Sequence, residues 1–397
     1  MRDGFAKFHF RFYLENKLQS KKTLIAGYVR SPFTAARKGA LAAIRPDDLS
    51  AQVIRALMAK VNVPADEIED VIWGCAYPEG EQGLNLGRIV SMLAGLPESV
   101  SGVTVNRWCG SAMQSVQDAA GMIATNAGDA FICGGVESMS RVPMYGFNMA
   151  PPTAWTQEQQ DAYIKVGLTA ERVAAMYGLT RDMQDQFGFE SQAKAFAAQI
   201  EGRLTDEIVP IRIENTVVDK DGCIRQPSLE KMAELKPPFL EDGTITAGTT
   251  SPMTDGATAL LVCADTFASK HGLRAQAEVV SFAVAGCAAD VMGLGPIGAS
   301  RKAMARAGLS IGDIDVVEMN EAFAAQAEAC RRELDIAPGK LNVDGGAIAL
   351  GHPLGATGGR LIGKAAQRLM RGEGRYALAT QCIGGGMGIA MVLKAVQ

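Results

Sequence analysis

The chain of 397 residues is 48% hydrophobic and 21% charged, and it contains 44 glycines. Its 39 basic and 43 acidic residues give a net charge of −4 without long runs of either sign, which argues against nucleic acid or an anionic membrane as the main partner. The length predicts one large or two medium domains, and the abundant glycine is typical of an α/β enzyme with many tight strand–helix turns.

The cysteine and histidine content narrows the chemistry. Eight cysteines occur, none in a close pair with metal-ligand spacing, so we expect free thiols in a reducing compartment and no metal site. The three histidines are His9, His271 and His352. No apolar run is long enough to cross a membrane and no signal peptide is evident, so we expect a cytoplasmic protein without stable membrane insertion.

Residues 1–21 differ in composition from the rest of the chain. Asp3 and Glu15 argue against a transit peptide, which would be poor in acidic residues. An expression leader and translation from an upstream start codon are the alternatives, and we predict an N-terminal extension that need not be ordered. Phenylalanines alternate there with basic residues and could form a short strand or an adhesive arm (Phe5, Lys7, Phe8, His9, Phe10, Arg11 and Phe12).

Hydrophobic periodicity predicts alternating strands and amphipathic helices over the next part of the chain. From residue 141 to about residue 243 charges become dense, which is typical of a long insertion between two compact halves. Strands are expected at 23–29, 68–74, 103–105 and 130–135, helices at 49–61, 86–94, 112–127 and 184–199, and apolar strand character over 243–264.

After about residue 275 the first pattern recurs. Ile314 lies 314 − 68 = 246 residues after Ile68, and His352 lies 352 − 109 = 243 residues after Cys109. Two similar offsets predict an internal duplication, in which equivalent turns of two related halves face each other. Helices are expected at 299–307 and 356–370 and a strand at 376–380, residues 310–319 repeat the pattern of 64–73, and residues 341–343 lead into the glycine-rich turn. The predicted domains are 22–140 with 244–272, the insertion 141–243, and 273–397.

A reactive cysteine is expected where the strand ending at residue 105 turns into a helix. Cys109 is followed at once by Gly110 and Ser111. The positive end of the helix dipole and the free amide groups of such a turn favour the thiolate, which is the nucleophile. A buried structural cysteine is the alternative.

Three later segments carry further candidate groups. His352 lies in the glycine-rich segment 345–359, where Pro353 disfavours helix at the histidine, and a Cys–His pair is a usual way to form a thiolate nucleophile. Cys382 precedes four glycines in five residues, a loop that can present amides to an oxyanion, cradle a phosphate or form a packing turn. Asn320 follows a buried strand and could equally be a helix N-cap.

Four segments together resemble the signature blocks of the thiolases, in the same order along the chain. The resemblance extends from about residue 22 to the C-terminus and implies the thiolase fold, an α/β fold of two duplicated βαβαβαββ-type halves in a five-layer αβαβα arrangement with an inserted loop domain. It also implies a homodimer or homotetramer. The four segments are Asn106–Ala112, Asn320–Phe323, Gly345–Gly359 and Cys382–Gly388.

The resemblance also implies roles for individual residues. Cys109 would be the nucleophile that carries the acyl group, and Cys382 the acid/base that moves a proton at the α-carbon. His352 would activate Cys109 and, with a water held by Asn320, stabilise a thioester oxyanion. The amides of Cys109 and Gly384 would form the second oxyanion site. A Claisen condensation or its reverse needs both a thiolate for the acyl-enzyme and a separate base.

Coenzyme A is the co-substrate that the resemblance implies, with no permanently bound cofactor. Ser251 matches the serine that contacts pantetheine, and it closes the segment that begins at Ala247 and Gly248. Arg225, in the predicted insertion, is a candidate phosphate contact. The apolar walls would be Phe239, Ala322 and Phe323.

Two positions favour the degradative branch of the family, which cleaves 3-ketoacyl-CoA in fatty-acid β-oxidation. Lys165-Val166-Gly167 stand where biosynthetic members carry His-Met-Gly, and the segment Thr246-Ala247-Gly248-Thr249 has Thr where they carry Asn. Losing the bulky His and Met should leave room for a longer acyl chain. Such an enzyme could also associate with a multifunctional β-oxidation subunit.

Four other functions compete with this interpretation. A biosynthetic acetyl-CoA C-acetyltransferase would be confined to acetoacetyl-CoA. A ketoacyl synthase would pair its cysteine with His/His or His/Asn, and a papain-like hydrolase would need neither the duplication nor Cys382. A non-catalytic thiolase-like lipid carrier is expected to lack one of the reactive residues.

Overall fold

The computed structural model describes residues 21–152 and 154–396. The alternating aromatic and basic residues expected as a strand or arm therefore lie outside the described residues. No helix in the described part of the chain is both long enough and apolar enough to span a membrane.

The first half is built on a five-stranded sheet in the order β4-β3-β5-β8-β1. Strands β3, β4 and β5 run parallel, and β8 runs antiparallel to both β5 and β1. The short β2 (Thr34–Ala35) pairs with β8. The five strands are β1 (Thr23–Arg30), β3 (Asp70–Gly74), β4 (Ser101–Val105), β5 (Ala130–Ser138) and β8 (Thr254–Ala264), and the helices of this half are α2 (Pro46–Val61), α3 (Leu86–Leu93) and α4 (Ser111–Ala124).

The second half repeats this arrangement in the order β10-β11-β12-β9. Leu341 forms a parallel bridge to Val317 of β10, at the position that β4 occupies beside β3. The matching strand order confirms the duplication expected from the offsets. The strands are β9 (Ala277–Gly286), β10 (Val316–Met319), β11 (Tyr376–Ile383) and β12 (Met387–Lys394), and the helices are α9 (Asp265–Lys270), α10 (Gly295–Ala307), α11 (Ala324–Glu333), α12 (Ala347–Leu350) and α13 (Leu354–Met370).

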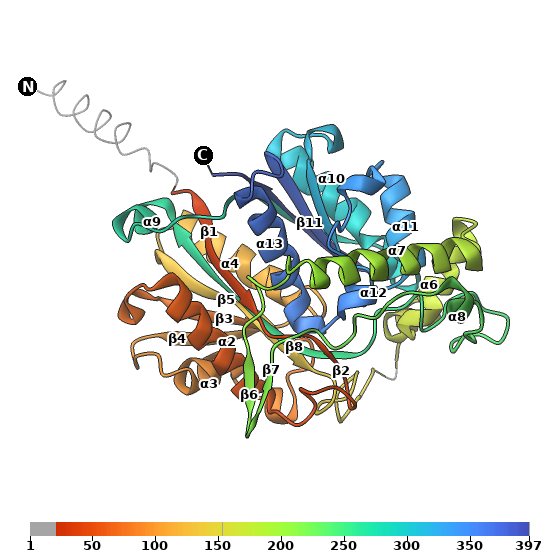
Figure 1. Ribbon diagram of the computed structural model, residues 1–397, viewed down its shortest axis with the longest axis horizontal. Helices are drawn as coiled ribbons and strands as arrows, with labels where there is room; N and C mark the ends of the chain where they lie inside the picture. Colours follow the sequence, from red (N-terminus) through yellow and green to blue (C-terminus); the bar gives the residue numbers. More distant parts are fainter. Residues whose placement is uncertain (1–20, 153, 397) are drawn as a thin grey trace, which may run out of the picture.

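The helices and sheets stack in five layers (Figure 1). Helices α4 and α13 lie between the two sheets, α2 and α3 cover the outer face of the first sheet, and α10 covers the outer face of the second. Strands β1 and β9 pair at Leu24–Glu278 and Ile25–Ala277, so the two sheets join into one ten-stranded sheet. The arrangement brings the ends of α4 and α13, which follow the two candidate turns, to the centre of the molecule.

The central helix α13 is buried along most of its length, and small residues let it approach its neighbours. A Cβ on Gly358 would lie 2.5 Å from the backbone nitrogen of Met113 in α4. The same helix carries buried charges, each of which is paired. Lys364 lies 2.7 Å from Asp344, and Arg368 contacts Glu318.

The predicted insertion packs on both halves rather than standing apart. Its Glu207 and Asp221 both form buried ion pairs with Arg30 of β1. The apolar strand expected from residue 243 begins only at Thr254, because residues 243–253 form a loop that packs against the turn before α11. The domain boundaries stay predictions. The elements of this segment are α5 (Gln157–Gln160), α6 (Val166–Met176), α7 (Arg181–Ile200), β6 (Ile211–Ile213), β7 (Thr216–Val218) and α8 (Leu229–Ala233).

The helix crossing at Gly358 generates a first prediction. In Gly358→Ala the new methyl group collides with the backbone of α4, so we expect the free energy of unfolding to fall by about 1–3 kcal/mol. Gly121→Ala is the matched control, since a Cβ on that glycine of α4 meets nothing within 4 Å. This variant should gain up to about 1 kcal/mol from helix propensity. Chemical-unfolding midpoints measure both changes, and equal midpoints for the two variants would contradict the packing argument.

Candidate active site

Cys109 lies in the turn between β4 and α4, as the sequence predicts. Trp108 adopts a positive φ of 43°, and its backbone N–H donates to the side chain of Asn106 at 2.8 Å. Ser111, the first residue of α4, accepts a hydrogen bond from the backbone N–H of Arg107 at 2.9 Å. The turn is thus closed on both sides of Cys109 by side-chain hydrogen bonds, which hold the thiol in one place.

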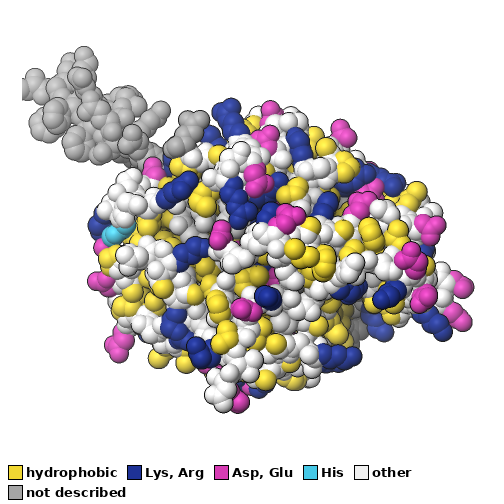
Figure 2. Space-filling view, in the orientation of Figure 1, with side chains coloured by type: hydrophobic (Ala, Val, Ile, Leu, Met, Phe, Trp, Pro, Cys, Tyr) yellow, Lys and Arg dark blue, Asp and Glu magenta, His cyan; other side chains and the backbone are white. Residues whose placement is uncertain are grey.

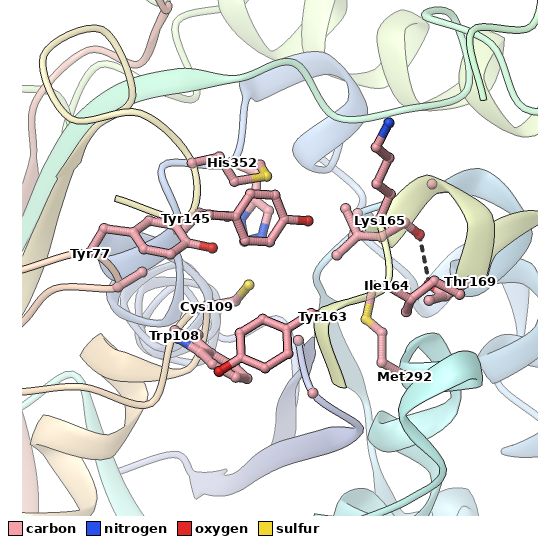
Figure 3. A pocket seen from close by; sticks show the side chains of 18 of the residues that line it. Tyr77, Trp108, Cys109, Tyr145, Tyr163, Ile164, Lys165, Thr169, Met292 and His352 are labelled. Atoms are coloured by element: carbon pink, nitrogen blue, oxygen red, sulfur yellow. Dashed lines mark hydrogen bonds between the residues drawn. The ribbon is translucent and has the colours of Figure 1, made fainter. Parts of the chain in front are cut away.

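Cys109, His352, Cys382 and Gly384 all line one cavity of about 660 Å³. Figure 3 shows the Cys109 sulfur near the middle of this cavity, with His352 on one side and Trp108 on the other. Methionine and aromatic side chains form much of the wall, including Met139, Met144, Tyr145, Met149, Tyr163, Met253 and Met292. A mainly apolar wall around a few polar groups is typical of a small-molecule site.

Burial determines the protonation state of the Cys109 thiol. Burial raises the pKa of its thiol to about 11, and the nearby charge of Glu137 also acts to raise it. The backbone N–H of Gly384 acts in the opposite direction but is outweighed by burial. At rest the thiol is therefore protonated, because the loss of hydration destabilises the thiolate more than the backbone N–H groups of Gly384 and Cys109 stabilise it. A base must take the proton when the substrate reacts.

His352 lines the same cavity, and hydrogen bonds fix the orientation of its ring. Its Nδ1 lies 2.6 Å from the hydroxyl of Thr357, and that hydroxyl donates to the carbonyl of Pro353 at 3.0 Å. The hydroxyl therefore accepts from Nδ1–H, and this network makes Nε2 the unprotonated nitrogen, which can accept a hydrogen bond. Burial, followed by the charge of Arg360, lowers the pKa of His352 to about 3, so the imidazole is neutral at rest.

Asn320 and Cys382 approach from the second half. Helix α11 begins at Ala324, so the alternative that Asn320 is its N-cap is wrong. The Asn320 side chain donates instead to His352 Nε2 at 3.3 Å. Cys382 lies near the end of β11, opposite Gly388 of β12, and burial raises the pKa of its thiol well above the usual value. The expected strand, glycine loop and second cysteine are all found.

Three buried residues that support the site were missed by sequence reasoning. Thr357 orients His352, and Gln381 donates a side-chain hydrogen bond to the carbonyl of Cys109 across the two halves. Glu137, at the end of β5, accepts N–H groups from both halves. A polar residue inside an otherwise apolar or glycine-rich segment was the available signal for each of them.

The predicted coenzyme A contacts divide into two groups. Ser251, Phe239, Ala322 and Phe323 line the cavity, and the Ser251 backbone N–H and hydroxyl both donate to the carbonyl of Ala322.

Ala247, Gly248 and Arg225 do not line the cavity. Ala247 and Arg225 are exposed, and Gly248 is packed against Met232 and Leu235. All the proposed contacts with coenzyme A stay predictions.

Among residues 21–152 and 154–396, no three His, Cys, Asp or Glu side chains cluster closely enough to hold a metal ion.

The raised pKa of Cys109 predicts how the thiol responds to pH. Only the thiolate reacts with iodoacetamide, so its alkylation rate should rise about tenfold per pH unit between pH 7 and 9, without reaching a plateau. Peptide mass spectrometry separates Cys109 from the other cysteines, of which only Cys287 is also half-buried. Cys109→Ser supplies the background, and a plateau beginning below pH 8 would contradict the prediction.

Comparisons with known proteins bear on the whole chain. A model described as thiolase, N-terminal domain, matches residues 23–266, and one described as thiolase, C-terminal domain, matches residues 273–395. The chain is 44% identical over 391 residues to a 3-ketoacyl-CoA thiolase of Alcanivorax borkumensis, covering 96% of this chain and 100% of that protein. It is also 44% identical over 388 residues to a protein of the same name from Shewanella frigidimarina, covering 95% and 100%. The chain belongs to the thiolase family.

Proposed function

We propose that the protein cleaves 3-ketoacyl-CoA with coenzyme A, giving acetyl-CoA and an acyl-CoA shortened by two carbons, as a reversible step of fatty-acid β-oxidation. The observation that carries the proposal is the convergence of Cys109, His352 and Cys382 on one apolar cavity. Family membership supports it, as do the relatives named 3-ketoacyl-CoA thiolase. The same names favour the degradative reaction over acetoacetyl-CoA synthesis.

The first half-reaction uses both cysteines. His352 Nε2 takes the proton of the Cys109 thiol as the sulfur attacks the 3-keto carbon of the substrate. The bond between carbons 2 and 3 then breaks, its electron pair leaves as the enolate of acetyl-CoA, and the Cys382 thiol protonates that carbanion. The products are acetyl-CoA and an acyl group bonded to Cys109, with Cys382 left as the thiolate.

The second half-reaction restores the resting state. The Cys382 thiolate takes the proton of coenzyme A, whose sulfur attacks the acyl carbon on Cys109. The acyl-CoA leaves, and the Cys109 thiolate recovers its proton from His352. The high pKa of both thiols in the resting state suits this cycle, since each begins and ends it as the neutral thiol.

Two donor sets would stabilise the negative oxygen atoms formed in these steps. The backbone N–H of Gly384 points toward the Cys109 sulfur, since it lowers the pKa of that thiol, and with the N–H of Cys109 it forms one predicted oxyanion site. His352 and a water held by Asn320 form the other. Preorganised donors of this kind are commonly the largest single contribution to acyl-transfer rates.

The acyl chain would occupy the part of the cavity walled by the predicted insertion. Ile164, Lys165 and Val166 line it, and the flexible Met144 and Met149 can adapt to different chains. Coenzyme A is a co-substrate in this proposal, and no permanently bound cofactor is needed.

The free edge of the first sheet supports a homodimer. Strand β4 has β3 as its single neighbour, and Val103 on it is 40% exposed. Leu84, just before α3, and Met92, within α3, are 91% and 63% exposed. An apolar edge strand is suited to pairing with a second copy of the same strand.

Elsewhere, Figure 2 shows charges of both signs mixed over the visible face, as expected for a cytoplasmic protein. A tetramer and a multifunctional β-oxidation subunit stay as further partner proposals.

Chain-length kinetics test the substrate class. We expect thiolysis of 3-ketohexanoyl-CoA and longer substrates at rates at least comparable to that of acetoacetyl-CoA. Val166→Met, which restores the bulk that biosynthetic members carry, should lower kcat/KM for the longer substrates about tenfold more than for acetoacetyl-CoA. Activity confined to acetoacetyl-CoA in the unaltered protein would instead support the biosynthetic alternative.

Substitution of each of the two cysteines should block a different step of the reaction. Incubation with labelled acetyl-CoA is expected to label Cys109, and Cys109→Ser should lose the label. Cys382→Ala should still be labelled but should fail to exchange the α-protons of acetyl-CoA with solvent, because it lacks the second base. Unchanged proton exchange in Cys382→Ala would rule out the assigned role, and absence of label in the unaltered protein would favour the lipid-carrier alternative.

A charged residue placed on the edge strand β4 tests the proposed dimer interface. Val103→Lys places a cation on each of the two paired edges, so sedimentation should show a shift from dimer toward monomer. Val280→Lys is the control, since Val280 is similarly exposed but lies on the interior strand β9. A dimer that persists in Val103→Lys would contradict this interface.

A further inference from the structure

Glu137 is a buried carboxylate beside the site to which the proposed reaction gives no role. It lies near the carboxyl end of β5 and is 1% exposed. Within the described ranges 21–152 and 154–396, Glu137 forms no ion pair with a lysine or arginine, by an N···O limit of 4.0 Å. An unpaired buried carboxylate is costly unless hydrogen bonds satisfy it.

Four N–H groups satisfy this carboxylate. The backbone N–H groups of Ala76 and Gly355 both donate to Oε2 at 2.9 Å. The Gln82 side chain donates to Oε1 at 2.8 Å, and the Tyr77 backbone donates to the same oxygen at 3.3 Å. Burial raises the pKa of Glu137, and these four N–H donors act against that rise, since they match the ionised carboxylate, which only accepts.

The contact with Gly355 joins the two halves. Gly355 is the second residue of α13, and the first N–H groups of a helix have no partner within it. Glu137 therefore caps the central helix of the second half from a strand of the first half. The negative charge also lies at the positive end of that helix, where it is stabilised.

The approach of the two elements at this point is very close. A Cβ on Gly355 would lie 2.6 Å from the carbonyl oxygen of Val136 and 2.9 Å from Glu137 Oε2. A Cβ on Gly135 would lie 2.3 Å from the carbonyl oxygen of Gly355. Both glycines are therefore needed for the cap, and the position of α13 on β5 is tightly defined.

The cap is next to the His352 turn along the chain and contacts Tyr77, which lines the cavity with Cys109. His352 is three residues before Gly355, Thr357 is two residues after it, and Tyr77 lines the cavity beside Cys109. We propose that Glu137 is a positioning residue, which holds the His352 turn of one half against the Cys109 turn of the other and supplies a negative charge beside the nucleophile. This inference rests on the proposed function for its effect on turnover, but not for its effect on the thiol.

The ionisable groups around the thiol agree with that assignment. The charge of Glu137 acts to raise the pKa of Cys109 and of Tyr77. The cavity that Cys109 lines also holds other titratable residues, but Glu137 is the charged residue that acts on the pKa of Cys109; the others are Tyr77, Glu79, Tyr145, Tyr163, Lys165, His352 and Cys382. Glu137 is thus the nearby charge that a substitution can remove.

Two substitutions at Glu137 distinguish its positioning role from the effect of its negative charge. Glu137→Gln keeps the size but removes the charge, and its amide NH2 faces two of the four donors. We expect kcat for thiolysis to fall at least about tenfold with KM changed less than about threefold, and alkylation of Cys109 at pH 8.5 to become at least about threefold faster. Glu137→Asp keeps the charge but is too short to reach Gly355, so kcat should fall while the alkylation rate stays near that of the unaltered protein.

The controls keep the two parts of the inference distinct. Glu171→Gln alters another buried glutamate that accepts backbone N–H groups, those of Thr244 and Ile245, and it should leave the alkylation rate of Cys109 unchanged. A folded Glu137→Gln protein with kcat within twofold of the unaltered protein and an unchanged alkylation rate would overturn the inference. If Glu137→Gln does not fold, unchanged kcat in Glu137→Asp would overturn the positioning role. An unaltered protein that alkylates as described but lacks thiolysis would instead count against the proposed function alone.

Discussion

The contact between the first turn of α13 and the end of β5 is the constraint on which the site depends. Glycines at 135 and 355 bring the two backbones together, and Glu137 caps the helix across the junction of the halves. Since His352 lies immediately before this helix and Cys109 lies before α4, which packs against it, one helix pair sets the distance between Cys109 and His352. Any residue that separates α4 from α13 should act on stability and on chemistry together.

Burial is the second physical theme of the site. An imidazole with a pKa of about 3 and a thiol with a pKa of about 11 form a neutral pair, so charge appears in the cavity only as the reaction proceeds. Electrostatic contributions are strong in such surroundings because water does not screen them. The N–H groups of Cys109 and Gly384 and the side chains of His352 and Asn320 are suited to stabilise that transient charge.

The walls of the cavity come from parts of the chain that are far apart in sequence. The loop before β8 is tied to the turn before α11 by the hydrogen bonds of Ser251 to Ala322. The insertion supplies the opposite wall through residues 162–169 and Phe239. Turns and a strand of the two packed halves thus hold Cys109, His352 and Cys382, whereas loops and the insertion form much of the remaining cavity wall.

The sequence by itself determined the alternation of strands and helices, the duplication, the turn that holds Cys109, and the glycine-rich loops that hold His352 and Cys382. These features depend on local periodicity and on short-range backbone requirements, which neighbouring residues encode. The extent of β8, the place of Asn320 outside a helix, the neutral state of Cys109, and the supporting roles of Glu137, Thr357 and Gln381 were decided only by the tertiary structure. Each of these depends on burial or on a partner far away in the chain, and residue spacing carries no information about either.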